Sequence, residues 1–363
     1  MWWIFGIPIL VIILFVLFMF WATKRGEQQV KLALERLAAI DQSRVIPDEK
    51  NAAQIYDDIQ AHYSFSVDMN DTEVVSEIYA KLKKLLDYEQ CYYPIPSYSD
   101  LDYMSHISAM RKSALFLREM AFIDLAEGTL AAAFEKLSCL KQISRHIQQQ
   151  PDTIDFLVRI AVDGIAVRFL SCIIMQTTVT EENLDMAAAL SGQLEDEWAE
   201  VTELTFEVDR LQDVIYRKEL RQWQWHPSNW RYSISIFFSG DYNIEENIKL
   251  QYLFLIAGRR TLHILTELRR YYNENGQWPE TLEEIKSTVP ELAWVDPYTK
   301  ASFIYKKEGD GFRLYSKGPN GTDENGSHDG PADDQLFWPP SGTYKEKLPI
   351  QKTLGIESTT QEN

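Results

Sequence analysis

The alternation of apolar and polar positions divides this chain into four regions. Residues 1–23 are almost wholly apolar, residues 24–250 repeat apolar positions at helical spacing, and residues 251–341 pass from one helical pattern to short alternating runs. Residues 342–363 are mostly polar and predict a disordered tail. We therefore expect a mostly α protein with an N-terminal transmembrane helix, a repeat-like helical bundle, and a small α+β C-terminal domain in which a helix precedes a small antiparallel sheet with an acidic loop.

The apolar run from Trp2 to Ala22 has the length of a membrane-spanning helix. About 20 residues that rise 1.5 Å each match the thickness of the hydrocarbon core, and tryptophans near both ends favour the two interfaces. The residues Phe20-Trp21-Ala22-Thr23 lack the small-x-small pattern of a signal-peptide cleavage site. The sequence thus predicts a single-pass anchor that holds the protein in the cell membrane through residues 2–22.

The charges near this anchor give opposite indications of its orientation. Lys24, Arg25, Lys31 and Arg36 all follow the span, and the positive-inside rule would place the body in the cytoplasm. The acidic body and its acidic loop suit calcium-rich surroundings better than a cytosol. We expect an extracytoplasmic, periplasmic body, and a cytoplasm-facing tetratricopeptide-like scaffold is the alternative.

Amphipathic helices dominate residues 24–250. The segment from Ala114 to Ile147 predicts two helices joined by Glu127-Gly128 and resembles one tetratricopeptide unit, although three successive units cannot be traced. The next helix, Thr153 to Met175, is apolar on nearly all sides, which predicts a central position in the core. Acidic residues between Glu195 and Asp209 indicate a solvated helix face. These features predict a helical bundle that serves as an interaction domain.

Composition excludes several classes of function. The formal net charge of −18 argues against nucleic acid as a partner, because affinity for nucleic acid comes mainly from cations that neutralise phosphates. Cys91, Cys139 and Cys172 show no metal-ligand or disulfide spacing, and the last two fall in apolar helical patterns as buried small side chains. No zinc site or disulfide framework is expected.

No motif in the chain predicts a catalytic centre. The six histidines show no paired ligand spacing, and phosphate-binding loops, nucleophile elbows and dinucleotide fingerprints are missing from the sequence. His146 ends a predicted helix, where a cation would suit the helix dipole. We therefore predict no catalytic residue and no enzyme. The alternative is an envelope hydrolase that uses paired carboxylates of the helical body.

The C-terminal region has the clearest local signals. A long helix is expected to end at Asn275-Gly276, and alternating runs at 303–305 and 312–316 flank Gly309-Asp310-Gly311 as a β-hairpin. An acidic, glycine-rich loop from Asn320 to Asp334 follows, with oxygen-bearing side chains of the kind that a hard cation such as Ca²⁺ prefers.

The order of these motifs resembles the periplasmic part of the major pseudopilin of type II secretion systems. The resemblance covers about residues 255–338 and rests on Asn275-Gly276-Gln277-Trp278-Pro279, Asp296-Pro297-Tyr298, Tyr315-Ser316-Lys317-Gly318, and the loop that leads through Asp334 to Trp338. It implies a small sheet beside a helix, a structural calcium ion, and a link to type II secretion or a pilus-like assembly. The prepilin-peptidase signature of that family is missing, so processing as a pilin is not expected.

The resemblance also implies the calcium ligands, which the acidic loop supplies. An EF-hand register starting at Asp323 fails, because His328 stands where glycine is required and Asp334 replaces glutamate. The side chains implied as ligands are those of Asn320, Asp323, Asn325, Asp333 and Asp334. The sequence as a whole thus predicts a membrane-anchored, non-catalytic envelope protein whose only cofactor is calcium.

Overall fold

Helices make up most of the described part of the chain. The computed structural model describes residues 24–63, 69–95, 105–176, 178–192, 194, 198–224, 244–327 and 333–340. Within these residues, the chain is mostly helical and also forms a small three-stranded antiparallel sheet. This confirms the predicted helical body and the predicted small sheet. The predicted anchor and the tail lie outside these ranges, and no helix within them is long and apolar enough to cross a membrane.

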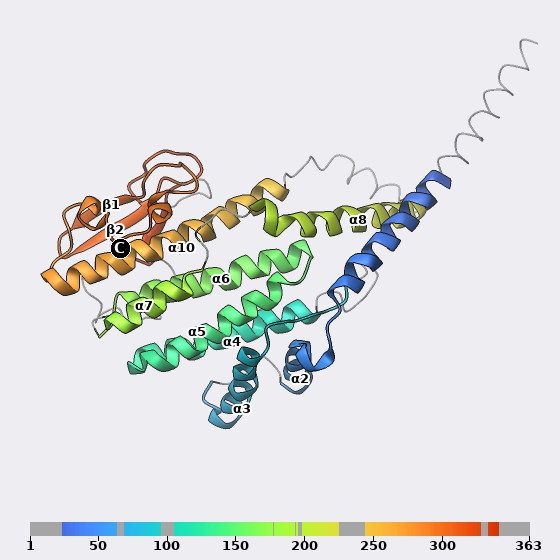
Figure 1. Ribbon diagram of the computed structural model, residues 1–363, viewed down its shortest axis with the longest axis horizontal. Coiled ribbons are helices and arrows are strands. Elements are labelled where there is room, and N and C mark those ends of the chain that lie inside the picture. Colours follow the sequence, from blue (N-terminus) through green and yellow to red (C-terminus); the bar gives the residue numbers. More distant parts are fainter. Residues whose placement is uncertain are drawn as a thin grey trace, which may run out of the picture.

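The helical body forms a stack of long helices with smaller helices at its sides (Figure 1). Helix α4 packs on α5, α5 on α6, and α6 on α10, and the sheet packs on α10 through β3 (Figure 1). The helical elements, in chain order, are residues 24–44, η1 (Asp48–Lys50), α2 (Ala53–His62), α3 (Thr72–Lys83), η2 (Lys84–Asp87), α4 (Ser105–Glu127), α5 (Leu130–Gln148), α6 (Thr153–Ile174), α7 (Glu181–Leu190), α8 (Trp198–Gln224), α10 (Ile244–Asn275), η4 (Leu282–Ile285) and η5 (Glu291–Trp294).

Helix α6 lies in the middle of the body, as its apolar pattern predicts. Phe156 and Phe169 on one side join the core between α6, α10 and the sheet, whereas Val162 and Ala166 join the core beneath α2, α4 and α5. A helix that is buried on both sides has no polar face, which explains the near-continuous apolar sequence. The two cores therefore meet through α6.

Local signals fix the ends of the central helices. Asp152 caps α6 by accepting a hydrogen bond from the Ile154 backbone N–H at 2.7 Å. Helices α4 and α5 form the hairpin that the sequence predicts, with its turn at Gly128. Helix α10 ends at the predicted position, where Gly276 takes a φ of +70° and its N–H reaches the Tyr272 carbonyl at 2.8 Å.

The C-terminal sheet consists of β1 (Ile304–Glu308), β2 (Gly311–Ser316) and β3 (Gln335–Trp338), in the order β1-β2-β3. Strands β1 and β2 form the predicted hairpin, in which Ile304 pairs with Tyr315 and Glu308 pairs with Gly311. Strand β3 pairs with β2 in antiparallel fashion, with a register shift between Leu314 and Tyr315. The chain between β2 and β3 contains the acidic loop.

Two of the sequence motifs attach this sheet to α10. Trp278 is 2% exposed, donates its indole N–H to the Asp310 carbonyl at 2.9 Å, and packs against Tyr272 and Phe312. Asp296 is buried and accepts hydrogen bonds from Ser316 Oγ at 2.8 Å and from the Tyr298 backbone N–H at 3.0 Å. The motifs thus hold the end of the helix, the hairpin turn and the start of the loop together.

Candidate functional site

The acidic loop leaves β2 at Ser316 and returns to β3 at Gln335, and the structure describes it up to Ser327 and again from Asp333. Its backbone curls tightly, because Asn325 and Gly326 both adopt positive φ values, 61° and 79°. All five predicted ligands lie in this loop or at its return. The contacts of their side chains divide them into two groups.

The first group brings Asn320 together with three carboxylates. Asn320 Nδ2 lies 3.0 Å from Glu324 Oε1 and 3.5 Å from Asp333 Oδ1. The Glu324 carboxyl lies within hydrogen-bonding reach of Asp334, whose Oδ2 accepts a hydrogen bond from the Gly326 N–H at 2.6 Å. Glu324 Oε2 is buried and accepts no hydrogen bond from the residues that the structure describes. Several oxygens therefore face one another in this part of the loop.

The electrostatics of Asp334 reflect this crowding. Asp334 is fully buried, and burial raises the pKa of its carboxyl. The Gly326 N–H favours the charged form, whereas the neighbouring Glu324 and Asp323 carboxylates raise the pKa of Asp334 further. A cation beside these carboxylates would favour their ionised forms.

The second group surrounds a lysine of the sheet. The Lys306 ammonium, on β1, lies 2.7 Å from Asn325 Oδ1, 3.8 Å from Asp323 Oδ1 and 5.3 Å from the centre of the Tyr315 ring. Tyr315 also donates its hydroxyl proton to Asp323 Oδ1 at 2.9 Å. Two of the five predicted ligands, Asp323 and Asn325, therefore contact a cation that the chain itself supplies.

The fit of a calcium ion to the loop differs between the two groups. Carboxylate oxygens such as those of Glu324, Asp333 and Asp334 suit a hard cation, whereas Asn320 turns its Nδ2 toward Glu324 and Asp333, and its Oδ1 accepts the Thr322 N–H at 2.8 Å. Asp323 and Asn325 are engaged by Lys306. Across the described ranges, no group of three or more His, Cys, Asp or Glu side chains already has metal-binding geometry. The loop thus holds a suitable donor set that a bound ion would have to draw together.

Two residues of this site were missed in the sequence. Glu324 falls between Asp323 and Asn325, the alternating positions predicted as ligands. The tight turn at Asn325 nevertheless turns Glu324 back toward Asp334. Lys306 lies almost twenty residues earlier, on β1, and its position opposite Arg313 on β2 follows from the hairpin register. A register built from the Gly309-Asp310 turn would have indicated that Lys306 flanks the loop.

A buried ionic cluster lies in the helical body, where α5, α6 and α10 meet. Asp163 on α6 accepts hydrogen bonds from Lys141 Nζ and from Arg259 Nη2, both at 2.7 Å, and is 1% exposed. Burial alone would raise the pKa of Asp163, but the two cations outweigh burial and hold that pKa well below its usual range. Burial lowers the pKa of Lys141. These contacts join three helices from distant parts of the chain.

The prediction for His146 is wrong. Its ring is fully buried, with Nδ1 2.9 Å from the Tyr56 hydroxyl and Nε2 2.8 Å from the Tyr88 carbonyl. Burial lowers the pKa of His146, so the ring is neutral near pH 7 and contributes no cation to the helix end. Periodicity placed the residue correctly at the end of α5, but not on its buried side, where η2 and α2 cover it.

Carboxylates of the helical body serve mainly as structural partners. Asp155 on α6 pairs with His106 at 3.2 Å, and Glu207 on the predicted acidic face pairs with Arg36 at 2.7 Å. The hydrolase alternative requires two carboxylates across a cleft; among the residues that the structure describes, the linings of the two cavities presented below include no Asp or Glu. Cys139 and Cys172 are buried, as expected for small apolar side chains, and Cys91 is buried as well.

Comparisons with known proteins add no family to this account. A scan against protein-family models finds no match, and searches of the curated proteins and of the solved structures find no similar protein either. The functional argument therefore rests on the residues and contacts of the chain itself.

Proposed function

We propose that this chain is a membrane-anchored, non-catalytic envelope protein with a helical interaction domain and a calcium-stabilised, pseudopilin-like C-terminal unit that serves type II secretion or a pilus-like assembly. The apolar run of residues 2–22 supports the anchor. The order of the motifs from Asn275 to Trp338 supports the resemblance of the C-terminal unit to a pseudopilin. Residues outside that unit supply the helical surface for partners.

The observation that carries the calcium proposal is the buried Oε2 of Glu324, which accepts no hydrogen bond within the described ranges, beside the buried carboxylate of Asp334. Two carboxylates that face each other repel when both are ionised, and a divalent cation removes this repulsion. Asn320, Glu324, Asp333 and Asp334 would hold the ion. Calcium would then order the loop between β2 and β3, without any catalytic role.

Thermal unfolding in metal-depleted buffer tests this proposal. A ligand that binds only the folded chain stabilises it by about 2.7 kcal/mol when its free concentration is a hundredfold above Kd. Calcium should therefore raise the melting temperature by several degrees, and EDTA should reverse the change. Magnesium is the matched control ion, because it demands a smaller octahedral site. Equal melting temperatures in calcium and in EDTA would defeat the calcium proposal.

Membrane topology tests the other half of the proposed function. A phosphatase fused after the last residue is active only outside the cytoplasm, whereas a fluorescent protein that folds only in the cytoplasm reports the opposite orientation. Phosphatase activity in the membrane fraction is the expected result. Fluorescence without phosphatase activity would support the cytoplasm-facing scaffold, to which Lys24 and Arg25 point.

A further inference from the structure

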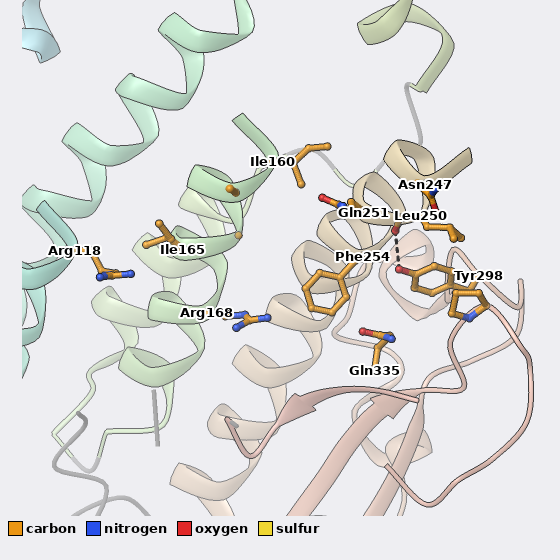
Figure 2. A pocket seen from close by; sticks show the side chains of 13 residues that line it. Arg118, Ile160, Ile165, Arg168, Asn247, Leu250, Gln251, Phe254, Tyr298 and Gln335 are labelled. Carbon is orange, nitrogen blue, oxygen red and sulfur yellow. Dashed lines mark hydrogen bonds between the residues drawn. The ribbon is translucent and has the colours of Figure 1, made fainter. Parts of the chain in front are cut away.

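A groove of about 760 Å³ runs along the surface between α6, α10 and the C-terminal unit (Figure 2). Helix α6 and helix α10 form its two long walls, Arg118 reaches it from α4, and Tyr298 and Gln335 close it on the side of the sheet. The Tyr298 hydroxyl donates a hydrogen bond to the Leu250 carbonyl at 2.9 Å, which ties the C-terminal unit to α10 at this wall. The volume lies within the range of ligand-binding sites.

The lining of this groove differs in charge from the rest of the chain. The protein has 54 acidic and 36 basic residues, yet the described residues of the lining include two arginines, Arg118 and Arg168, and no Asp or Glu. The Arg168 guanidinium is exposed and lies 5.7 Å from the centre of the Phe254 ring. Arg118 pairs with Glu119 at 2.6 Å, and that carboxylate is not part of the lining. The described lining of the groove is therefore basic rather than acidic, with Arg168 as its exposed arginine.

Three carboxamides complete the polar part of the groove. Asn247 and Gln251 extend from α10, and Gln335 begins β3 and is 8% exposed. A carboxamide both donates and accepts hydrogen bonds, which matches the alternating N–H and C=O groups of a peptide backbone. Between these groups the lining is apolar, with Ile165 and Phe254 as examples, and a smaller cavity of about 60 Å³ continues below Phe254.

Gly164 lines the groove and leaves open space beside α6. It lies inside α6, where glycine is less favourable than alanine by about 0.5–1 kcal/mol, and a Cβ at this position would meet nothing within 4 Å. Gly258 on α10 is different, because a Cβ there would lie 2.9 Å from Val167 Cγ1. Close helix packing thus explains Gly258, whereas Gly164 faces open space in the groove.

We propose that this groove binds an acidic, partly apolar peptide segment of a partner protein. Arg168, supported by Arg118, would hold carboxylates of the peptide, since a guanidinium pairs with a carboxylate through two parallel hydrogen bonds. The three carboxamides would bind the peptide backbone, and apolar side chains would cover Phe254 and Ile165. The inference names a partner class for the interaction role proposed above and rests on that role.

Panning of a random peptide library on the full-length chain in detergent tests this inference. Enriched peptides should carry Asp or Glu beside apolar residues, and a labelled representative should bind at least about tenfold more weakly to Arg168→Glu. Gly164→Trp, which fills the groove, should also weaken binding. Gly164→Ala is its matched control, and Arg210→Glu, on exposed α8 surface, is the matched charge reversal.

Three outcomes overturn the inference. Enrichment of basic or neutral peptides, equal affinity for the wild type and for both groove variants, or no enrichment at all would each exclude an acidic peptide as the ligand. A dimer that Arg168→Glu converts to a monomer would assign the groove to a second copy of the chain instead. The measurement requires neither calcium nor a membrane, so its failure is distinguishable from failure of the calcium proposal or of the anchor.

Discussion

The buried cluster at Asp163 and the acidic loop at Asp334 hold carboxylates in opposite ways. In the cluster, one carboxylate lies between the cations Lys141 and Arg259, and its pKa is depressed. In the loop, a buried carboxylate faces further carboxylates, and its pKa is raised. The contrast shows that the cluster balances its buried carboxylate with cations of the chain, whereas Asp334 is buried beside further carboxylates.

The largest predicted effect concerns the buried cluster at Asp163. Asp163→Asn leaves Lys141 and Arg259 buried without their carboxylate, which should lower the free energy of unfolding by about 3–5 kcal/mol in urea denaturation. The matched variant Asp155→Asn removes another buried carboxylate of α6, paired with a single histidine, and should lower it less. A loss for Asp163→Asn below that of Asp155→Asn would mean that the cluster does not join the three helices.

The second prediction concerns the acidic loop at Asp334. Glu324→Gln should remove the calcium-dependent part of the stability, about 2.7 kcal/mol at a hundredfold excess over Kd, because it removes a charged donor and the repulsion that calcium relieves. Thermal unfolding with calcium and with EDTA measures this difference. The variant should melt at one temperature in both buffers, and a calcium response equal to that of the wild type would contradict the assigned donor set.

Two glycines test the packing of α6 against α10, the helices that carry Asp163 and Arg259. Gly258→Ala places a Cβ against Val167 and should lower the free energy of unfolding by about 1–3 kcal/mol. Gly164→Ala adds a methyl group in open space inside a helix and should raise it by about 0.5–1 kcal/mol. Urea denaturation of the two variants measures both values. Equal effects of the same sign would show that α6 and α10 are not packed as described.

A fourth prediction concerns pH and the buried ring of His146. Its folded pKa lies below that of the unfolded chain, so the unfolded state binds more protons when the pH falls below about 6.5. The free energy of unfolding should then fall with falling pH, by up to about 1.4 kcal/mol per pH unit from this group. Above that pH the ring is neutral in both states and contributes no slope.

The control for this pH effect is His146→Gln, which retains hydrogen-bonding capacity toward Tyr56 and Tyr88 without a titrating ring. The variant should lose stability at pH 7 and show a shallower dependence between pH 7 and pH 5 than the wild type. Urea denaturation at several pH values measures the slope. An unchanged slope would assign the acid sensitivity to other groups, such as the half-buried His263, whose pKa is also lowered.

Local signals in the sequence predicted much of this fold. The α4–α5 hairpin, the apolar α6, the end of α10 at Gly276 and the hairpin around Gly309 all follow from periodicity and turn chemistry, which act over a few residues. These features depend on residues that are close together in the sequence. The structure therefore agrees with the sequence wherever a single element carries its own signal.

Long-range pairings could not be predicted in the same way. Arg259 lies 96 residues from Asp163, and only the packing of α10 on α6 brings them together. To predict the burial of His146, one must know which face of α5 is covered. To predict the groove, one must know the relative positions of Arg118 and Arg168 on different helices. The loop was found by its composition, but its division into two groups depends on Lys306, which another strand supplies.

Equilibrium dialysis against radioactive calcium tests the central claim most directly, because it measures binding without reference to stability. The account predicts that the wild-type chain binds a single calcium ion, that Glu324→Gln and Asp334→Asn lose it, and that Asp323→Asn, next to Lys306, retains it. A wild-type chain that binds no calcium, or equal losses in Asp323→Asn and Glu324→Gln, would contradict the account.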